Sequence, residues 1–179
     1  DDSLKRTAKE VLQRLKICQP WLSYEKRLRF AEVAKNKLFR SAQPSLPALN
    51  YFVNRYNLKS LIVLREHGEP ELMAHSKKLG LTVCHISLKS GRPPDKPEIN
   101  FFFEFISDSN NCPSLIHCLQ GRDRTGCLCF VYRVEKMEWT ADDAWHEMKN
   151  LGFLSLPWHR WTQCRIKEWL EQRYNKKFE

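Results

Sequence analysis

Short apolar runs rich in Leu, Ile and Val alternate with segments of helical periodicity between residues 37 and 137. A short run of that kind is typical of a buried strand, whereas apolar residues repeating at helical spacing are typical of an amphipathic helix. The alternation predicts an α/β fold with a mostly parallel central sheet of four or five strands and helices on both faces. The expected strands lie within 37–45, 58–65, 81–88 and 113–118, and the expected helices within 45–56, 69–80, 98–108, 124–137, 140–152 and 158–174.

The segment before residue 37 is expected to be helical. Residues 4–17 carry apolar side chains at helical spacing with a basic outer face, and residues 24–35 form a second candidate helix. The length of 179 residues suits one domain, and neither a linker nor an internal repeat divides it. We therefore expect a single domain over 1–179, with residues 1–36 as a helical N-terminal appendage.

The charge balance favours an anionic partner. Lys and Arg number 30 against 21 Asp and Glu, which gives a net charge of +9. The basic residues are scattered, and no basic stripe with interleaved aromatic residues is evident, which argues against a nucleic-acid partner. The nearest approach to such a stripe is Trp158, His159, Arg160 and Trp161, which fit better as residues that dock a helix.

No apolar run approaches the roughly 20 residues that a membrane helix needs, so no membrane span is expected. The chain begins with Asp, and an export signal that had been removed would leave no trace. The compartment therefore stays open between the cytoplasm and, after removal of a signal, the periplasm.

The seven cysteines stand at positions 18, 84, 112, 118, 127, 129 and 164, and no two of them form a Cys-x-x-Cys pair. That spacing gives little support to a zinc site or a thioredoxin-like redox site. Cys84, Cys127 and Cys129 lie in apolar company and are expected to be small core residues. Cys118 is different, because it ends the strand 113–118 just before a loop.

Cys118 is the candidate nucleophile. Ligands of open α/β sheets bind beyond the carboxyl ends of the strands, and a thiol at a helix N-terminus with cations close by is favoured as the nucleophilic thiolate. Between Cys118 and Arg124 the backbone can curl into a nest of N–H groups suited to phosphate, and Gly121 permits the curl. Arg124 offers a planar fork for two phosphate oxygens, and Thr125 offers a hydroxyl.

The stretch "HCLQGRDRTG" resembles the His-Cys-x5-Arg-Thr-Gly signature of the cysteine-dependent protein tyrosine phosphatase superfamily. The region from 38 to about 157 is similar to small bacterial dual-specificity-like members of that superfamily. "LFRSAQPS", "SLIVLR", "RPPDKPEI" and "GFLSLP" follow one another in the order that such members have.

The resemblance implies a hydrolase that forms a phosphocysteine intermediate and needs no metal or other cofactor. Cys118 is then the nucleophile, and Arg124 with the loop amides stabilises the transferred phosphoryl group. Thr125 steadies the sulfur as leaving group, and His117 holds the loop and favours the thiolate. The residues implied to bind substrate through the loop are Leu119, Gln120, Gly121, Arg122 and Asp123.

The general acid of such an enzyme is usually an aspartate on a loop before the signature strand. The loop "SGRPPDKPE" offers Asp95 as the first candidate and Glu98 as the second. The Trp-Pro-Asp form of that loop is absent, and the same residues could instead start the following helix.

The five residues "GRDRT" (121–125) resemble the Gly-x-Asp-Arg-Thr of members directed at lipid phosphates and inositides. Arg122 adds a cation that suits a substrate with more than one phosphate, while Asp123 is expected to orient Arg122 or Lys89 or to bond loop amides. Because ligands of α/β sheets bind beyond the carboxyl ends of the strands, we expect further cations at the same rim, namely Arg65, His67, Lys89 and Arg92. The expected substrate is an inositol polyphosphate.

Three alternatives remain open at this point. A protein tyrosine or dual-specificity phosphatase acting on a phosphoprotein would use the same loop, an RNA 5′-triphosphatase shares the signature, and a non-catalytic module could bind phosphate. Arg40, Ser41 and Gln43 either brace the loop or form a turn fixed by local hydrogen bonds and Pro44.

Overall fold

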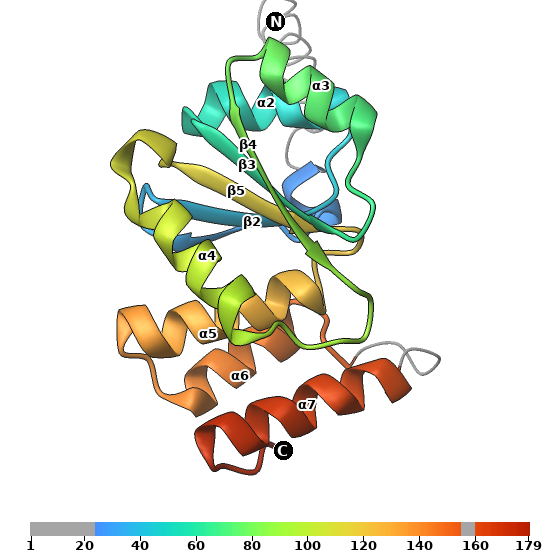
Figure 1. Ribbon diagram of the computed structural model, residues 1–179, viewed down its shortest axis with the longest axis vertical. Coiled ribbons are helices and arrows are strands. Elements are labelled where there is room, and N and C mark those ends of the chain that lie inside the picture. Colours follow the sequence, from blue (N-terminus) through green and yellow to red (C-terminus); the bar gives the residue numbers. More distant parts are fainter. Residues whose placement is uncertain (1–23, 155–159) are drawn as a thin grey trace, which may run out of the picture.

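A computed structural model describes residues 24–154 and 160–179, and its centre is a five-stranded sheet with the order β1-β2-β5-β3-β4 (Figure 1). Strands β2, β5, β3 and β4 run parallel to one another, and β1 pairs antiparallel with β2 at one edge of the sheet. The predicted α/β fold and all four predicted strands are confirmed. The strands are β1 (Ala31–Ala34), β2 (Leu38–Ala42), β3 (Ser60–Arg65), β4 (Thr82–Leu88) and β5 (Ser114–Cys118).

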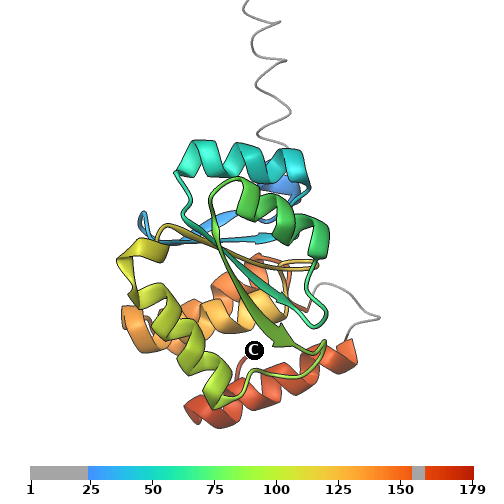
Figure 2. The ribbon, with the colours of Figure 1, turned by 45° about the horizontal axis from the view of Figure 1, so that its top comes forward.

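Helices cover both faces of the sheet, as expected. In Figures 1 and 2, α2 and α3 lie on one face, and α4, α5, α6 and α7 lie on the other. Among the described residues, no helix has both the length and the apolar character needed to cross a membrane. The helices are α2 (Leu46–Tyr56), α3 (Pro70–Lys78), α4 (Lys96–Ser107), the short 3-10 helix Ser109–Asn111, α5 (Arg124–Met137), α6 (Ala141–Asn150) and α7 (Arg160–Tyr174).

The central strands divide the core into two parts. Side chains alternate between the faces of a strand, so neighbouring residues of β3 and β5 enter different clusters. Leu61, Val63 and Leu115 pack under α2 and α3, whereas Ile62 and Ile116 pack under the helices of the other face. Burial on both faces explains why these strands are continuously apolar in sequence.

Short polar side chains start the helices that flank the sheet. The Ser45 hydroxyl accepts from the N–H of Ala48 at the start of α2, and the Thr140 hydroxyl accepts from the N–H of Asp143 at the start of α6. Asn57 ends α2 with φ of 51°, in the left-handed region that asparagine tolerates.

The expected helix over 24–35 is wrong. Only residues 24–27 are helical, the chain turns at Arg29, and β1 follows. Phe30 stacks on Phe52 with ring centroids 4.4 Å apart, which draws the chain onto the sheet, where β1 pairs with β2. Tertiary pairing thus overrides the helix propensity of the segment "AEVA". The helix expected over 4–17 lies outside the described residues.

The carboxyl ends of the parallel strands meet at one edge of the sheet. Ala42 of β2 is in register with Cys118 of β5, and Arg65 of β3 is in register with Leu88 of β4. The loops that follow β5 and β4 therefore leave the sheet at the same edge, which is where an α/β fold binds its ligands.

Candidate active site

Cys118 is the last residue of β5, and the loop 119–123 carries the chain from its sulfur to the start of α5. The residue is 2% exposed and lies at the base of this loop. The N–H of Gly121 donates to Cys118 Sγ at 3.2 Å. A backbone amide thus points at the sulfur, as the nest expected from the sequence requires.

Gly121 is the residue that lets the loop pass the end of β2. Its φ is +66°, and a Cβ added there would lie 2.6 Å from the Ala42 nitrogen and 2.7 Å from the Ser41 carbonyl carbon. Both contacts are with backbone atoms of β2, which cannot move aside. Only glycine fits this position.

Three successive loop carbonyls accept hydrogen bonds from donors outside the loop. Because the C=O and N–H of a trans peptide point in opposite directions, these donors turn the following amides toward the sulfur side. Of the three residues expected either to brace the loop or to form a local turn, Arg40 and Gln43 bond the loop, whereas the Ser41 hydroxyl donates locally to the Ala42 carbonyl. The pairs are Gln43 N with Leu119 O at 3.2 Å, Arg29 Nη1 with Gln120 O at 3.1 Å, and Arg40 Nη2 with Gly121 O at 2.5 Å.

Arg124 begins α5 and links the two loops at this edge. Its Nη1 donates to the carbonyl of Leu88, the last residue of β4, at 3.2 Å. This bond uses one of the five N–H donors of the guanidinium. The remaining N–H groups could donate hydrogen bonds to an oxyanion bound beside the loop.

His117 and Thr125 are both fully buried beside this loop. Burial, with smaller contributions from the charges of Arg65 and Arg124, lowers the pKa of His117 to about 4, so the ring is neutral near pH 7. Its Nδ1 carries the proton, because that atom lies 3.3 Å from the Cys118 carbonyl, which can only accept. The Thr125 hydroxyl has no hydrogen-bond partner among the described residues.

Asp123 is held from α7. The amide nitrogen Nε2 of Gln163 donates to Asp123 Oδ1 at 2.8 Å, and Gln163 is 1% exposed. Among the described residues, no hydrogen bond joins the Asp123 carboxylate to Arg122, to Lys89 or to a loop amide, so the bond from Gln163 replaces all three expected roles. Sequence reasoning missed Gln163, because nothing in the local pattern of a helix near the C-terminus points to a loop 40 residues earlier.

Arg122 is half-buried, and its Nε and Nη1 atoms are buried without a hydrogen-bond partner among the described residues. Buried polar atoms are almost always paired, so an exception at a candidate site calls for an explanation. An anion bound beside the loop would provide one.

Asp95 caps the N-terminus of α4. Its carboxylate accepts from the N–H of Glu98 at 3.0 Å, and the Glu98 carboxylate accepts from the N–H of Asp95 at 2.7 Å. Arg92 forms ion pairs with both carboxylates. The side chain of Asp95 stays 53% exposed. The segment "PPDKPE" thus starts a helix, as one of the two interpretations predicted. The guanidinium of Arg92 is paired with the carboxylates of Asp95 and Glu98.

The other rim cations differ in their surroundings. Arg65 donates to Gln43 Oε1 at 2.9 Å and forms an ion pair with Glu69. Lys89 and His67 are exposed beyond the ends of their strands. Lys89 and His67 are therefore the residues of this group whose side chains are exposed to solvent.

The cysteines in the apolar segments are core residues, as expected. Burial raises the pKa of Cys84 and of Cys129 to about 11, and it also raises the pKa of Cys127. These groups therefore stay as neutral thiols near pH 7. In the described part of the chain, no cluster of three or more His, Cys, Asp or Glu residues is placed to hold a metal ion.

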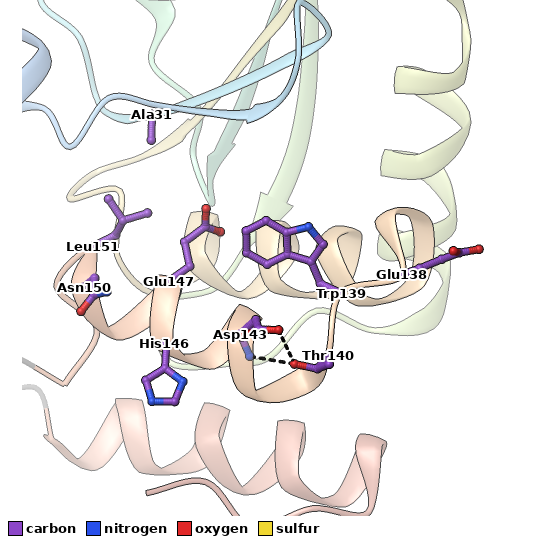
Figure 3. Close-up of a pocket in the computed structure, with 9 residues that line it drawn as sticks. All are labelled: Ala31, Glu138, Trp139, Thr140, Asp143, His146, Glu147, Asn150 and Leu151. Atoms are coloured by element: carbon purple, nitrogen blue, oxygen red, sulfur yellow. Dashed lines mark hydrogen bonds between the residues drawn. The ribbon is translucent and has the colours of Figure 1, made fainter.

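A pocket of about 710 Å³ lies away from this loop, at the start and along one side of α6 (Figure 3). Among its lining residues, Glu147 pairs with Arg133 at 2.5 Å, and the Arg133 guanidinium lies 4.0 Å from the centre of the Trp139 ring. This pocket shares no residue with the Cys118 loop.

Comparison with known proteins places the geometry in a family. Residues 26–152 match the model of the tyrosine phosphatase family. The inositol diphosphatase DSP4 of Arabidopsis thaliana is 35% identical over 106 residues, covering 56% of this chain and 52% of that protein. The inositol diphosphatase SIW14 of Saccharomyces cerevisiae is 26% identical over 122 residues, covering 65% of this chain and 43% of that protein.

The chain thus spans about half the length of the curated relatives that it matches. These relatives come from a plant and a yeast, so the resemblance to bacterial members stays a prediction.

Solved structures agree on the fold. The core catalytic domain of SIW14 in complex with citrate superposes with a TM-score of 0.66 at 23% identity, over 82% of this chain and 92% of that one. TpbA of P. aeruginosa superposes with a TM-score of 0.63 at 19% identity, over 83% and 92%. The family match covers well over half of the sequence and includes the whole Cys118 loop. The chain belongs to the tyrosine phosphatase family.

Proposed function

We propose that this chain is a metal-independent phosphomonoester hydrolase that forms a phosphocysteine intermediate on Cys118 and acts on inositol polyphosphates. The observation that carries the mechanism is the Gly121 N–H aimed at Cys118 Sγ, inside a loop whose carbonyls are held outward. Donors arranged in this way before the reaction stabilise a thiolate first and the oxygens of a transferred phosphoryl group afterwards.

The transfer has two steps. The Cys118 sulfur attacks phosphorus, so an S–P bond forms while the P–O bond to the leaving oxygen breaks, and Asp95 gives that oxygen its proton. Water then attacks phosphorus and gives a proton to the Asp95 carboxylate, which restores the acid; the S–P bond breaks, the sulfur leaves as a thiolate, and phosphate is released. Arg124 and the loop amides hold the equatorial oxygens throughout.

Thr125 and His117 support the sulfur. The unpartnered, buried hydroxyl of Thr125 is available to donate to the sulfur when it leaves phosphorus. Neutral His117 holds the Cys118 carbonyl through its Nδ1 proton and so fixes the peptide that follows the nucleophile. The Thr125 hydroxyl is thus free for this role among the described residues, and the His117 Nδ1–H already bonds the loop.

Two observations support an inositol polyphosphate as substrate. The curated relatives reported above are inositol diphosphatases, and Arg122 supplies buried, unpartnered donors beside the loop. A second phosphate of the substrate would pair with such a cation, whereas a phosphotyrosine side chain carries only one phosphate.

The deciding experiment measures phosphate release from inositol polyphosphates, phosphotyrosine peptides and 5′-triphosphate RNA, with and without EDTA. We expect the highest kcat/KM on inositol polyphosphates and no effect of EDTA on that value. In Arg122→Ala, the ratio of kcat/KM on inositol polyphosphates to kcat/KM on phosphopeptides should be smaller than in the wild type. A higher kcat/KM on phosphopeptides would assign the chain to the protein phosphatases, and loss of activity in EDTA would contradict the metal-independent mechanism.

A further inference from the structure

Arg29 lies outside the signature loop, yet its side chain reaches that loop across 91 residues of sequence. Its Nη1 donates to the Gln120 carbonyl at 3.1 Å, and the same peptide unit carries the Gly121 N–H that lies 3.2 Å from Cys118 Sγ. The two ends of a trans peptide point in opposite directions. A donor that holds the oxygen therefore also sets the direction of the N–H.

The backbone of Arg29 does not account for an arginine at this position. Its φ is 50°, in the left-handed region, at the end of the helical turn 24–27. The N–H of Phe30 bonds the Glu25 carbonyl at 2.9 Å, and the N–H of Arg29 bonds the Lys26 carbonyl at 3.5 Å, which is the Schellman arrangement. Glycine is the usual residue there, since a side chain costs free energy in this conformation. The contact with the loop supplies a reason for the arginine.

Three guanidinium groups, those of Arg29, Arg40 and Arg122, lie close together around the loop. Burial lowers the pKa of Arg29 from its ordinary value, and repulsion from Arg122 and Arg40 lowers it further. A Cβ at Gly152 would lie 3.1 Å from Arg29 Nε and 3.2 Å from Arg122 Nε, so both side chains pack on the same stretch after α6. Cations held this close to each other make the surroundings of the sulfur favourable for an anion.

We infer that Arg29 is a positioning residue: by holding the 120–121 peptide, it aims the Gly121 N–H at the Cys118 sulfur and at an oxyanion bound over it. This role deepens the proposed function, on which its part in phosphoryl transfer rests. The part that concerns the sulfur itself does not depend on any substrate.

The test uses Arg29→Gly, which removes the side chain and suits the left-handed backbone, and Arg29→Lys, which keeps a cation. Two matched controls are Asn36→Gly, at another turn with φ of 51°, and Arg27→Gln, an exposed cation of the same helical turn. The first readout is the rate of Cys118 alkylation by iodoacetamide against pH, resolved by peptide mass mapping because Cys164 is exposed. The second is the affinity for inorganic vanadate, and the third is the melting temperature.

In Arg29→Gly we expect the midpoint of the alkylation profile to rise by about one pH unit and vanadate affinity to fall about tenfold, since a bond to a charged group is weakened. The melting temperature should stay at or above that of the wild type, and Arg29→Lys should recover most of the affinity. Both controls should match the wild type in alkylation and vanadate binding.

An alkylation profile and a vanadate affinity of Arg29→Gly equal to those of the wild type would overturn the inference. So would a melting temperature well below the wild type, which would assign the side chain to stability alone. If the wild type releases no phosphate from any inositol phosphate while the profile of Arg29→Gly shifts as expected, the proposed function fails and the role of Arg29 stands.

Discussion

Replacing Gly121 by alanine tests whether the shape of the loop governs the reaction. The new Cβ would lie 2.6 Å from the Ala42 nitrogen and 2.7 Å from the carbonyl carbon and oxygen of Ser41. These are backbone atoms at the end of β2, whose register with β5 is fixed at the adjacent pair Ala42 and Cys118. The loop rather than the strand has to move, and the bond from the Gly121 N–H to the sulfur is lost.

Gly80 provides the matched control for the backbone conformation. Its φ is +79°, and a Cβ there would meet nothing within 4 Å. Gly80→Ala therefore carries only the cost of a left-handed alanine, about 1–2 kcal/mol, which lowers the melting temperature of a chain of this size by about 2–8 °C. Gly121→Ala carries that same cost and the steric one as well.

The assay compares kcat on an inositol polyphosphate and the melting temperature in both variants. We expect Gly80→Ala to keep the wild-type kcat, and Gly121→Ala to lose about 100-fold, because a displacement of about 1 Å at a reacting group has an effect of that order. A kcat for Gly121→Ala equal to that of Gly80→Ala would refute the claim that the Gly121 amide must face the sulfur.

Four further substitutions probe the individual roles. Cys118→Ser should abolish phosphate release while the protein still folds and binds vanadate, and retained turnover would reject covalent catalysis. Asp95→Asn should lower kcat by about 10²–10⁴-fold while asparagine still caps α4, whereas Glu98→Gln should stay near the wild type; the opposite ranking in steady-state kinetics would move the acid to Glu98. The pKa of buried His117 is lowered from 6.5 to about 4, so the stability it contributes is complete above pH 6.5 and falls by up to about 3 kcal/mol as the pH drops toward 4. Unfolding experiments across that range should therefore show a smaller loss in His117→Gln than in the wild type, and equal losses would contradict a neutral His117.

The central strands and the nucleophile loop could be predicted because their causes are local. Buried strands need continuous apolar runs, and the runs at 58–65 and 113–118 have no other interpretation that leaves the following helices covered. The loop after Cys118 combines a glycine and an arginine at positions that an anion nest requires, so the sequence alone marks it. The fold brings that loop against Ala42, as the register of β2 with β5 shows.

The residues that escaped prediction act over long sequence distances. Arg29 and Gln163 each bond the loop from a distant segment, and neither stands in a local pattern that indicates such a contact. The edge strand β1 is four residues long, and three of its residues, two Ala and one Glu, favour helices, so the strand depends on its pairing with β2. For Asp95 the sequence predicted both a proton donor and a helix cap, and the cap is what the hydrogen bonds show.

The most direct test of covalent phosphoryl transfer is to quench the enzyme during turnover of an inositol polyphosphate and to map phosphate on its peptides by mass spectrometry. Phosphate attached to Cys118 in the wild type is the predicted result. Steady release of phosphate with Cys118 unmodified at every quench time would contradict it.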